Sequence, residues 1–474
     1  MMKTYITVVF YFLFATFSVA SERPNILFIL TDDLGWGDLG CYGNTRIKTP
    51  SLDRLAREGT LFTQYYQGGS VCSPSRSALM SGRLPAELKI HGHLSTAQQN
   101  TARGMVHFLD PSVTTLPCLL QQSGYQTVHV GKWHLGLPPN TPEGKNALQI
   151  YGFDKVRWLN CLEKIDGKTI NLWQTENRPR AANVLVDTTI ETLESADKDK
   201  PFFLQLWFND PHASLAPSEE QRKQYRVSLT PNGFTSPFEV YAATVTELDK
   251  QIGRLLDYLE QSGLAKNTIV IFSSDNGPED IEIGNASWSG VGSAGPLRGR
   301  KRSLYEGGIR LPFIVRWQGK TPAGQINNHS VISGTDLLPT LTAAAGITLH
   351  EEVQSVLRGE NVLAAFNGDT TFQRTKPLFW EWRFRIFNHL WNRSPILAIR
   401  EGQWKLLLNP DRSRVELYDI PNDSAEQNNV AEKYPDIVAK LSEKALVWQK
   451  TLPEGPYEPN AGKNDYPFPT ENKK

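Results

Sequence analysis

The stretch "NILFILTDD" at residues 25–33 joins an apolar run to two aspartates. Large apolar residues without polar alternation predict a strand that is buried on both faces of a sheet. Runs of the same character lie at residues 126–130, 202–208, 268–274 and 311–317, and helical patterns lie at residues 51–59, 114–124 and 240–263. Because strands alternate with helices, we expect an α/β domain with a mixed, mostly parallel sheet flanked by helices.

The pattern changes near residue 370. Segments 377–383, 396–408 and 415–420 predict antiparallel strands, and residues 435–451 predict a final helix. We therefore expect the large α/β domain over residues 21–370 and a small C-terminal α+β domain, with an antiparallel sheet, over residues 371–474.

The first twenty residues have the features of a signal peptide, namely Lys3, an apolar run and small residues before a cleavage site after Ala20. The apolar run at residues 5–20 is short for a membrane-spanning helix, and the sequence offers no other candidate span. Lys+Arg and Asp+Glu both number 50, which gives no electrostatic case for a nucleic-acid partner. We expect a protein exported to the periplasm or secreted, without a membrane span.

Polar residues follow four of the predicted strands at the point where each strand ends. They are Asp32, Asp33, Lys132, His134, Asn209, Asp210, His212, Asp275 and Asn276. Ligands of open α/β sheets bind outside the carboxyl ends of the strands, so we expect this set at one edge of the sheet. Each pair alone is also typical of an ordinary solvated turn.

The chemistry of this set is consistent. Asp32, Asp33, Asp275 and Asn276 supply hard oxygen ligands, which suit Ca²⁺ or Mg²⁺ better than Zn²⁺. The nearby cations and imidazoles suit an oxyanion ester held against a metal ion. They are Arg76, Lys132, Lys301, His134 and His212.

Cys72 stands in "GSVCSPSRSALMSGRLP" at residues 69–85, on a small-residue turn before a short helical pattern. From the residues alone, its thiol is half a disulfide, a metal ligand, a nucleophile or the precursor of another group. The other cysteines are Cys41, Cys118 and Cys161, and their pairing cannot be read from the sequence. We expect Cys72 at the amino end of its helix, where backbone N–H groups favour an anion.

Six segments in the same order resemble the motifs of the sulfatase family, in the alkaline phosphatase-like superfamily. They are "PNILFILTDDLGWGDLGCYG" at 24–43, "CSPSR" with "SALMSGR" at 72–83, "GYQTVHVGKWHLG" at 124–136, "FFLQLWFNDPH" at 202–212, "VIFSSDNG" at 270–277 and "GPLRGRKRSLYEGGIRLPFIV" at 295–315. The resemblance implies that a formylglycine-generating enzyme oxidises Cys72 to formylglycine, whose aldehyde is hydrated to a geminal diol. The diol would attack the sulfate ester and then expel sulfate by collapsing to the aldehyde.

The resemblance also implies a role for each matched residue. One Ca²⁺ would be held by Asp32, Asp33, Asp275, Asn276 and the formylglycine at Cys72. Arg76 and Lys132 would position the diol oxygens, and His134 would assist the elimination. His212 would protonate the departing alcohol, and Lys301 would bind the sulfate. The substrate-binding set is Lys301, His212 and His93, the last from the "HGH" segment at 91–93.

The expected reaction is hydrolysis of sulfate esters on a carbohydrate, of the polysaccharide-oligosaccharide or glycosaminoglycan type. Two alternatives stay open: a phosphonate monoester or phosphodiester hydrolase, and a sulfated-glycan binding protein with Cys72 unconverted. Arg300 and Arg302 replace glycines common in the family and suit solvated surface positions or contacts to an anionic substrate. Trp380 and Trp382 suit stacking on sugar rings, or the core for at least one of them.

Overall fold

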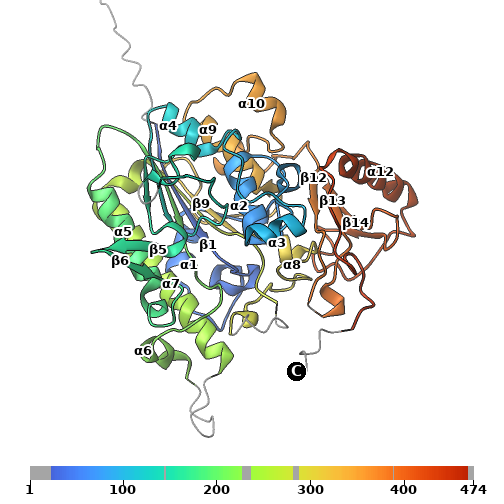
Figure 1. The fold of residues 1–474 in the computed structure, drawn as a ribbon, viewed down its shortest axis with the longest axis horizontal. Helices are drawn as coiled ribbons and strands as arrows, with labels where there is room; N and C mark the ends of the chain where they lie inside the picture. Colours follow the sequence, from blue (N-terminus) through green and yellow to red (C-terminus); the bar gives the residue numbers. More distant parts are fainter. Residues whose placement is uncertain (1–22, 143–145, 227–235, 281–287, 388, 468–474) are drawn as a thin grey trace, which may run out of the picture.

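The computed structural model describes residues 23–142, 146–226, 236–280, 288–387 and 389–467 (Figure 1). The expected signal peptide, residues 1–20, lies outside the described residues. Within those ranges, no helix has both the length and the apolar character needed to cross a membrane.

The main sheet has nine strands among the described residues, in the order β10-β2-β9-β8-β1-β7-β3-β4, with β11 paired to β2. Their bounds are β1 Asn25–Thr31, β2 Thr60–Tyr66, β3 Gln126–Gly131, β4 Lys155–Arg157, β7 Phe202–Trp207, β8 Thr268–Ser274, β9 Arg310–Arg316, β10 Gln325–Asn327 and β11 Ile332–Ser333. Only the pairs that β9 makes with β2 and β8 are antiparallel. The expected mixed, mostly parallel sheet is therefore confirmed.

Helices cover both faces of this sheet (Figure 1). The α-helices of the described residues are α1 Pro50–Glu58, α2 Cys72–Ser81, α3 Ala97–Ala102, α4 Leu116–Gln122, α5 Ala181–Glu194, α6 Glu219–Arg222, α7 Pro237–Gln261, α8 Glu306–Ile309, α9 Leu337–Ala344, α10 Glu351–Val356, α11 Leu363–Phe366 and α12 Pro435–Thr451. Ile26 and Phe28 of β1 join the core beneath α2, α4 and α9. Leu27 and Ile29 join the core beneath α1, α5 and α7. The unbroken apolar run of β1 is thus buried on both faces.

The C-terminal part has its own antiparallel sheet of β12 Leu378–Glu381, β13 Leu397–Glu401, β14 Trp404–Leu408 and β15 Glu416–Asp419. Helix α12 packs against β13 and β14, beside the main sheet (Figure 1). Trp380 and Trp382 are both buried in the core, so neither is free to stack on a sugar. A smaller hairpin joins β5 Leu162–Ile165 to β6 Lys168–Asn171. The domain boundary at residue 370 stays a prediction.

Strand β9 is antiparallel to both of its neighbours, β2 and β8, and this direction brings the segment before it to the site. Four adjacent strands, β8, β1, β7 and β3, are parallel and end at one edge of the sheet. Because β9 is antiparallel to β8, its amino end lies at that same edge. The segment that precedes β9, which carries Lys301, therefore comes to the edge where the other strands end.

Candidate active site

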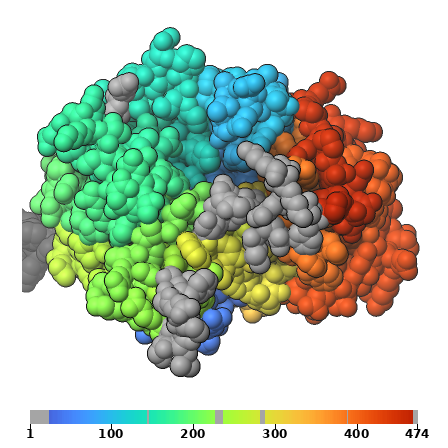
Figure 2. Space-filling model, turned by 60° about the horizontal axis from the view of Figure 1, so that its bottom comes forward, coloured from blue at the N-terminus to red at the C-terminus, as the bar shows by residue number. Residues whose placement is uncertain are grey.

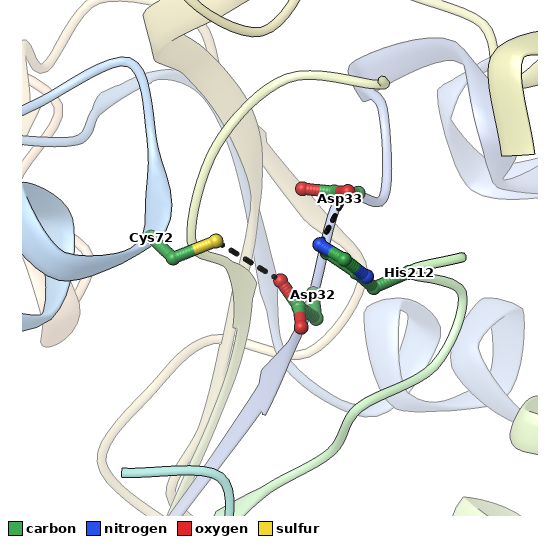
Figure 3. Close-up of side chains that lie close together, drawn as sticks. All are labelled: Asp32, Asp33, Cys72 and His212. Carbon is green, nitrogen blue, oxygen red and sulfur yellow. Dashed lines mark hydrogen bonds and ion pairs between the residues drawn. The ribbon is translucent and has the colours of Figure 1, made fainter. Parts of the chain in front are cut away.

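Asp32 and Asp33, which follow β1, and His212, which follows β7, lie close to Cys72, the first residue of α2 (Figure 3). The Cys72 Sγ lies 3.4 Å from Asp32 Oδ1, and the Lys132 ammonium lies 3.4 Å from the same sulfur. Burial raises the pKa of the Cys72 thiol, although the Lys132 charge acts in the opposite direction. As encoded, the side chain is therefore a neutral thiol buried among charged side chains.

Gly131, at the end of β3, directly precedes Lys132 and packs closely against β7. Gly131 has φ +107°, and a Cβ there would lie 2.0 Å from the carbonyl oxygen of Trp207 on β7. A larger residue at position 131 would therefore force β3 and β7 apart at their carboxyl ends. The backbone N–H of Lys132 donates a hydrogen bond of 2.8 Å to the Trp207 carbonyl, which holds the ends of β3 and β7 together.

Each buried carboxylate of the site is paired with a cation. Lys132 Nζ lies 2.5 Å from Asp32 Oδ2, and Lys301 Nζ lies 2.8 Å from the Asp33 carboxylate. The Arg76 guanidinium donates to Asp275 Oδ2 at 2.8 and 3.0 Å. Burial raises the pKa of Asp32, but the charges of Lys132, Arg76 and Lys301 outweigh it, and the net direction is down. These pairs make the buried charge of the site tolerable.

Asn276 has an amide oxygen without a partner. Its Nδ2 donates to Asp33 Oδ1 at 2.7 Å and to the Gly277 carbonyl at 2.9 Å, whereas its Oδ1 is buried and accepts no hydrogen bond from the described residues. Ligand atoms of Asp32, Asp33, Cys72 and His212 lie within 4.8 Å of one another. A buried amide oxygen without a partner, close to the clustered carboxylates of Asp32 and Asp33, fits a hard divalent cation.

His134 has one ring nitrogen without a partner among the described residues. Its Nε2 lies 3.1 Å from the Leu94 carbonyl, so Nε2 carries the proton and donates. Its Nδ1 is buried without a partner among the described residues. Burial, together with the charges of Lys132 and Arg76, lowers the pKa of His134 well below its ordinary value. The neutral ring therefore keeps a lone pair on Nδ1, as a base requires.

His212 is oriented by a hydrogen bond to the carbonyl of the next residue, Ala213. Its Nδ1 lies 2.7 Å from the Ala213 carbonyl, so Nδ1 donates, and its Nε2 lies 3.7 Å from Asp33 Oδ2 (Figure 3). The ring packs edge-on against Trp173, with 5.5 Å between the centroids. Burial lowers the pKa of His212 to about 3, with Asp33 acting in the opposite direction. Nε2 is thus the nitrogen available to a bound ligand.

Three residues singled out in the sequence, Asp210, Arg300 and Arg302, have partners away from Cys72. Asp210, after β7, forms an ion pair of 2.7 Å with Arg178. The expectation of solvated positions for Arg300 and Arg302 is wrong. Arg302 pairs with Glu279 and Asp280, and Arg300 donates to the carbonyls of Gly290 and Gly292 at 2.8 and 2.7 Å. The loop before β9 folds back on these carboxylates and carbonyls, so both guanidinium groups have partners within the protein.

Glu279 is a site residue that the sequence analysis did not identify. Its carboxylate lies 3.0 Å from Lys301 Nζ and also pairs with Arg302, so it fixes the lysine beside Asp33. Burial raises its pKa, but the charges of Lys301 and Arg302 outweigh this and hold the pKa well below its ordinary value, so the group is ionised. The sequence feature that could have identified it is its position three residues after Asn276, one of the predicted metal ligands.

The cysteines are all free in the structure, Cys41, Cys72, Cys118 and Cys161 alike. Of these, only Cys72 belongs to the group of possible metal ligands found in the described residues.

Comparisons with known proteins give this geometry a family. The sequence model described as Sulfatase matches residues 24–347, and the model described as N-sulphoglucosamine sulphohydrolase, C-terminal, matches residues 299–451. The chain is similar to human N-acetylgalactosamine-6-sulfatase, with 33% identity over 77% of this chain and 73% of the relative. It is also similar to N-acetylgalactosamine-6-O-sulfatase of Bacteroides thetaiotaomicron, with 28% identity over 89% of this chain and 92% of the relative.

A solved structure has the same fold. The crystal structure of Ps i-CgsB in complex with k-i-k-neocarrahexaose superposes with a TM-score of 0.73 and 27% sequence identity, covering 94% of this chain and 97% of that chain. The matched family model spans every strand that contributes to the site. The chain belongs to the sulfatase family and is a sulfuric ester hydrolase.

Proposed function

We propose that the protein hydrolyses sulfate esters on a sulfated carbohydrate, with formylglycine made from Cys72 and one Ca²⁺ ion. The observation that carries the proposal is the buried Cys72, held between the Lys132 ammonium and the Asp32 carboxylate at the start of α2. Support for a carbohydrate comes from relatives named N-acetylgalactosamine-6-sulfatase and N-acetylgalactosamine-6-O-sulfatase, and from the solved structure in complex with k-i-k-neocarrahexaose.

The metal set consists of Asp32, Asp33, Asp275 and Asn276, with the side chain at position 72. The fit rests on the buried carboxylates and on the unpartnered Asn276 Oδ1. When bound, Ca²⁺ would neutralise charge on the sulfate oxygens and formylglycine would supply a geminal diol as nucleophile. The rest of the chemistry falls to the protein's own side chains.

Arg76 and Lys132 hold the attacking group in position. Arg76 is fixed by Asp275 and by the Lys132 carbonyl, to which it donates at 2.7 Å. The Lys132 ammonium touches both the residue-72 side chain and Asp32, so it stabilises negative charge on the attacking oxygen. Lys301, ion-paired with Asp33 and Glu279, presents its ammonium to the sulfate.

The two histidines divide the proton transfers. His134 has an unprotonated Nδ1, so it accepts a proton from the second hydroxyl when sulfate is expelled. His212 offers Nε2 to the oxygen of the departing sugar alcohol and donates its proton there. Because His212 is neutral in the free site, this step requires that the bound anion favours protonation of Nε2. His93, Lys301 and His212 contact the substrate.

Export and maturation belong to the same proposal. Cleavage near Ala20 would deliver the chain to the periplasm or the exterior. A formylglycine-generating enzyme would convert Cys72 on the way.

One experiment on natively expressed protein tests the whole proposal. The mass of the tryptic peptide that spans Cys72 reports its conversion, and free sulfate reports turnover of sulfated mono- and oligosaccharides. We expect a converted peptide and sulfate release that a calcium chelator abolishes and added Ca²⁺ restores. An unmodified thiol in protein that binds but does not cleave would favour a glycan-binding role. A higher rate on nitrophenyl phosphonates than on nitrophenyl sulfate would favour a phosphonate hydrolase.

A further inference from the structure

Residues 91–105 form a segment beside the site that the proposed roles leave mostly unused. Leu94 ties this segment to both sides of the catalytic cluster. Its N–H donates to Ser73 Oγ at 2.9 Å, and its carbonyl accepts the His134 Nε2 hydrogen bond at 3.1 Å. The same Ser73 hydroxyl donates to the His134 carbonyl at 2.7 Å. His93, the residue before Leu94, is therefore held next to the residues that surround Cys72.

Arg103 lies in the same segment, and its guanidinium group contacts the His93 imidazole and the Phe384 ring. Its Nη1 lies 3.5 Å from His93 Nε2, and its guanidinium lies over the Phe384 ring, 5.3 Å from the centroid. In the part of the chain that the structure describes, no carboxylate lies within ion-pair distance of Arg103. The other cations of the site, such as Arg76 and Lys301, all have carboxylate partners. Among the described residues, Arg103 thus has no carboxylate partner for its positive charge.

Phe384 supports the guanidinium from the C-terminal part of the chain. The ring is nearly buried, packs edge-on against Trp382 at 5.1 Å, and lies so close to Gly92 that a Cβ there would be 2.9 Å from it. Figure 2 shows the light-blue surface of residues near 100 against the orange and red C-terminal surface. A planar cation over a fixed aromatic ring keeps its donors in a defined direction.

Positive charge accumulates around His93. Burial lowers the pKa of His93 to about 3, and the charges of Arg103, Arg302, Lys301 and Lys132 act in the same direction. Since arginine only donates, His93 Nε2 accepts from Arg103, and the proton of the neutral ring is on Nδ1. The segment therefore offers an arginine and an imidazole N–H, both donors, in a positive field.

We propose that Arg103 and His93 form a second anion subsite, which binds a carboxylate or a further sulfate on the same saccharide whose sulfate ester is cleaved. The proposal rests on the proposed function. An arginine fork is suited to oxyanions, and a charge-assisted hydrogen bond at a half-buried position discriminates well against a neutral group. The subsite selects glycans with acidic groups near the scissile sulfate over those with a single sulfate.

The test compares substrates that differ in one acidic group. The first pair is the unsaturated chondroitin 6-sulfate disaccharide and its carboxyl-reduced form. The second pair is a monosulfated and a disulfated form of that disaccharide with the same 6-sulfate. The measured quantity is the ratio of kcat/KM within each pair, for the wild type, Arg103→Gln, Arg103→Lys and Arg57→Gln. Arg57 is the matched control, because it is exposed at the end of α1, away from the edge that carries the site.

We expect the wild type to favour the more acidic member of at least one pair by ~10-fold or more. Arg103→Gln should bring that ratio close to one, Arg103→Lys should restore part of it, and Arg57→Gln should keep it. A ratio lost in the first pair identifies a carboxylate, and one lost in the second pair identifies a sulfate. Equal ratios in wild type and Arg103→Gln for both pairs overturn the subsite. Absence of sulfate release from every substrate by the wild type would instead count against the proposed function.

Discussion

Asp32 and Lys132 show how single residues prepare this site for chemistry. Both are buried, and each side chain touches Cys72 as well as the other. Buried ions that are paired in this way persist, whereas loss of one partner leaves an uncompensated charge. The residues around position 72 are therefore fixed before substrate arrives.

Replacing Cys72 by alanine separates chemistry from folding. Cys72→Ala removes the nucleophile precursor but no ion pair, so we expect sulfate release to vanish while the midpoint of thermal unfolding stays near that of the wild type. Circular dichroism and a free-sulfate assay measure the two quantities. Cys72→Ser is the sharper variant, because a single hydroxyl that accepts sulfate cannot expel it by collapse to an aldehyde. A peptide mass with sulfated serine would support the diol role, and steady turnover by this variant would contradict it.

The roles of the histidines predict different dependences on the leaving group. His212→Ala should lower kcat by ~10²–10⁴-fold on sugar sulfates, whose alkoxide needs a proton, and much less on nitrophenyl sulfate, whose phenolate is a good leaving group. His134→Ala should lower both rates together, because it acts after the alcohol has left. Equal losses on both substrates for His212→Ala would remove it from the acid role.

Among the secondary-structure elements, the presence of β2 and the direction of β9 could not be predicted from the sequence. The apolar runs of β1, β3, β7 and β8 and the last helix, α12, lie where their patterns predict them. The pattern did not reveal β2, because Thr63 and Gln64 interrupt its apolar residues and the strand follows α1 after a single glycine. A run of apolar residues does not indicate the direction of its strand within the sheet. The antiparallel orientation of β9 could therefore not be predicted from the sequence.

The residues of the candidate site were easier to predict from the sequence than the ion pairs that they form. Residues directly after strands come to one edge by topology alone, which is why Asp32, Lys132, His212 and Asp275 could be grouped in advance. The ion pairs among them depend on side-chain packing over long sequence separations, as with Asp33 and Lys301. Arg103 could not be found, because its contact with Phe384 joins the large sheet region to the C-terminal region.

The junction of α8 and β14 holds a buried charge cluster that predicts a stability effect. Lys405 Nζ lies 2.9 Å from both Glu306 and Glu426, and all three side chains are fully buried. Lys405→Met should lower the free energy of unfolding by ~3–5 kcal/mol, because it leaves buried carboxylates without this cation. The matched control is Lys440→Met, an exposed pair with Glu401 that should cost at most ~1 kcal/mol. Urea unfolding measures both, and equal losses would contradict the prediction.

The same cluster predicts a pH dependence. Burial raises the pKa of Glu426 to about 7, with Lys405 acting in the opposite direction. The folded protein then holds this proton more tightly than the unfolded chain, whose carboxyl titrates near 4.5. The contribution of Glu426 to stability is thus greatest at low pH and is lost as the pH rises from about 4.5 to about 7. The wild type should therefore lose stability relative to Glu426→Gln across this window, and parallel profiles would show that Glu426 is not the cause.

For the whole molecule, the metal set predicts a coupling between Ca²⁺ and global stability. A ligand that binds only the folded protein stabilises it by ~2.7 kcal/mol at a hundred times its dissociation constant. Ca²⁺ should raise the thermal unfolding midpoint of the wild type, and Asp275→Asn should weaken or abolish the rise. Mg²⁺ at equal concentration serves as the comparison. No shift in the wild type with a saturating concentration of Ca²⁺ would contradict the assignment of these residues as ligands.

The burial of residues 72–76 has a consequence for the order of events in biosynthesis. Cys72, Ser73, Pro74, Ser75 and Arg76 all lie inside the folded molecule, beneath the segment that Leu94 anchors. A second protein can read these five side chains only while α2 is still unfolded. Under the proposed maturation, oxidation of Cys72 would therefore compete in time with the folding of a chain whose site joins strands as distant as β1 and β9. Protein that folds first would keep its thiol permanently, so the active fraction of a preparation would be set during synthesis and not afterwards.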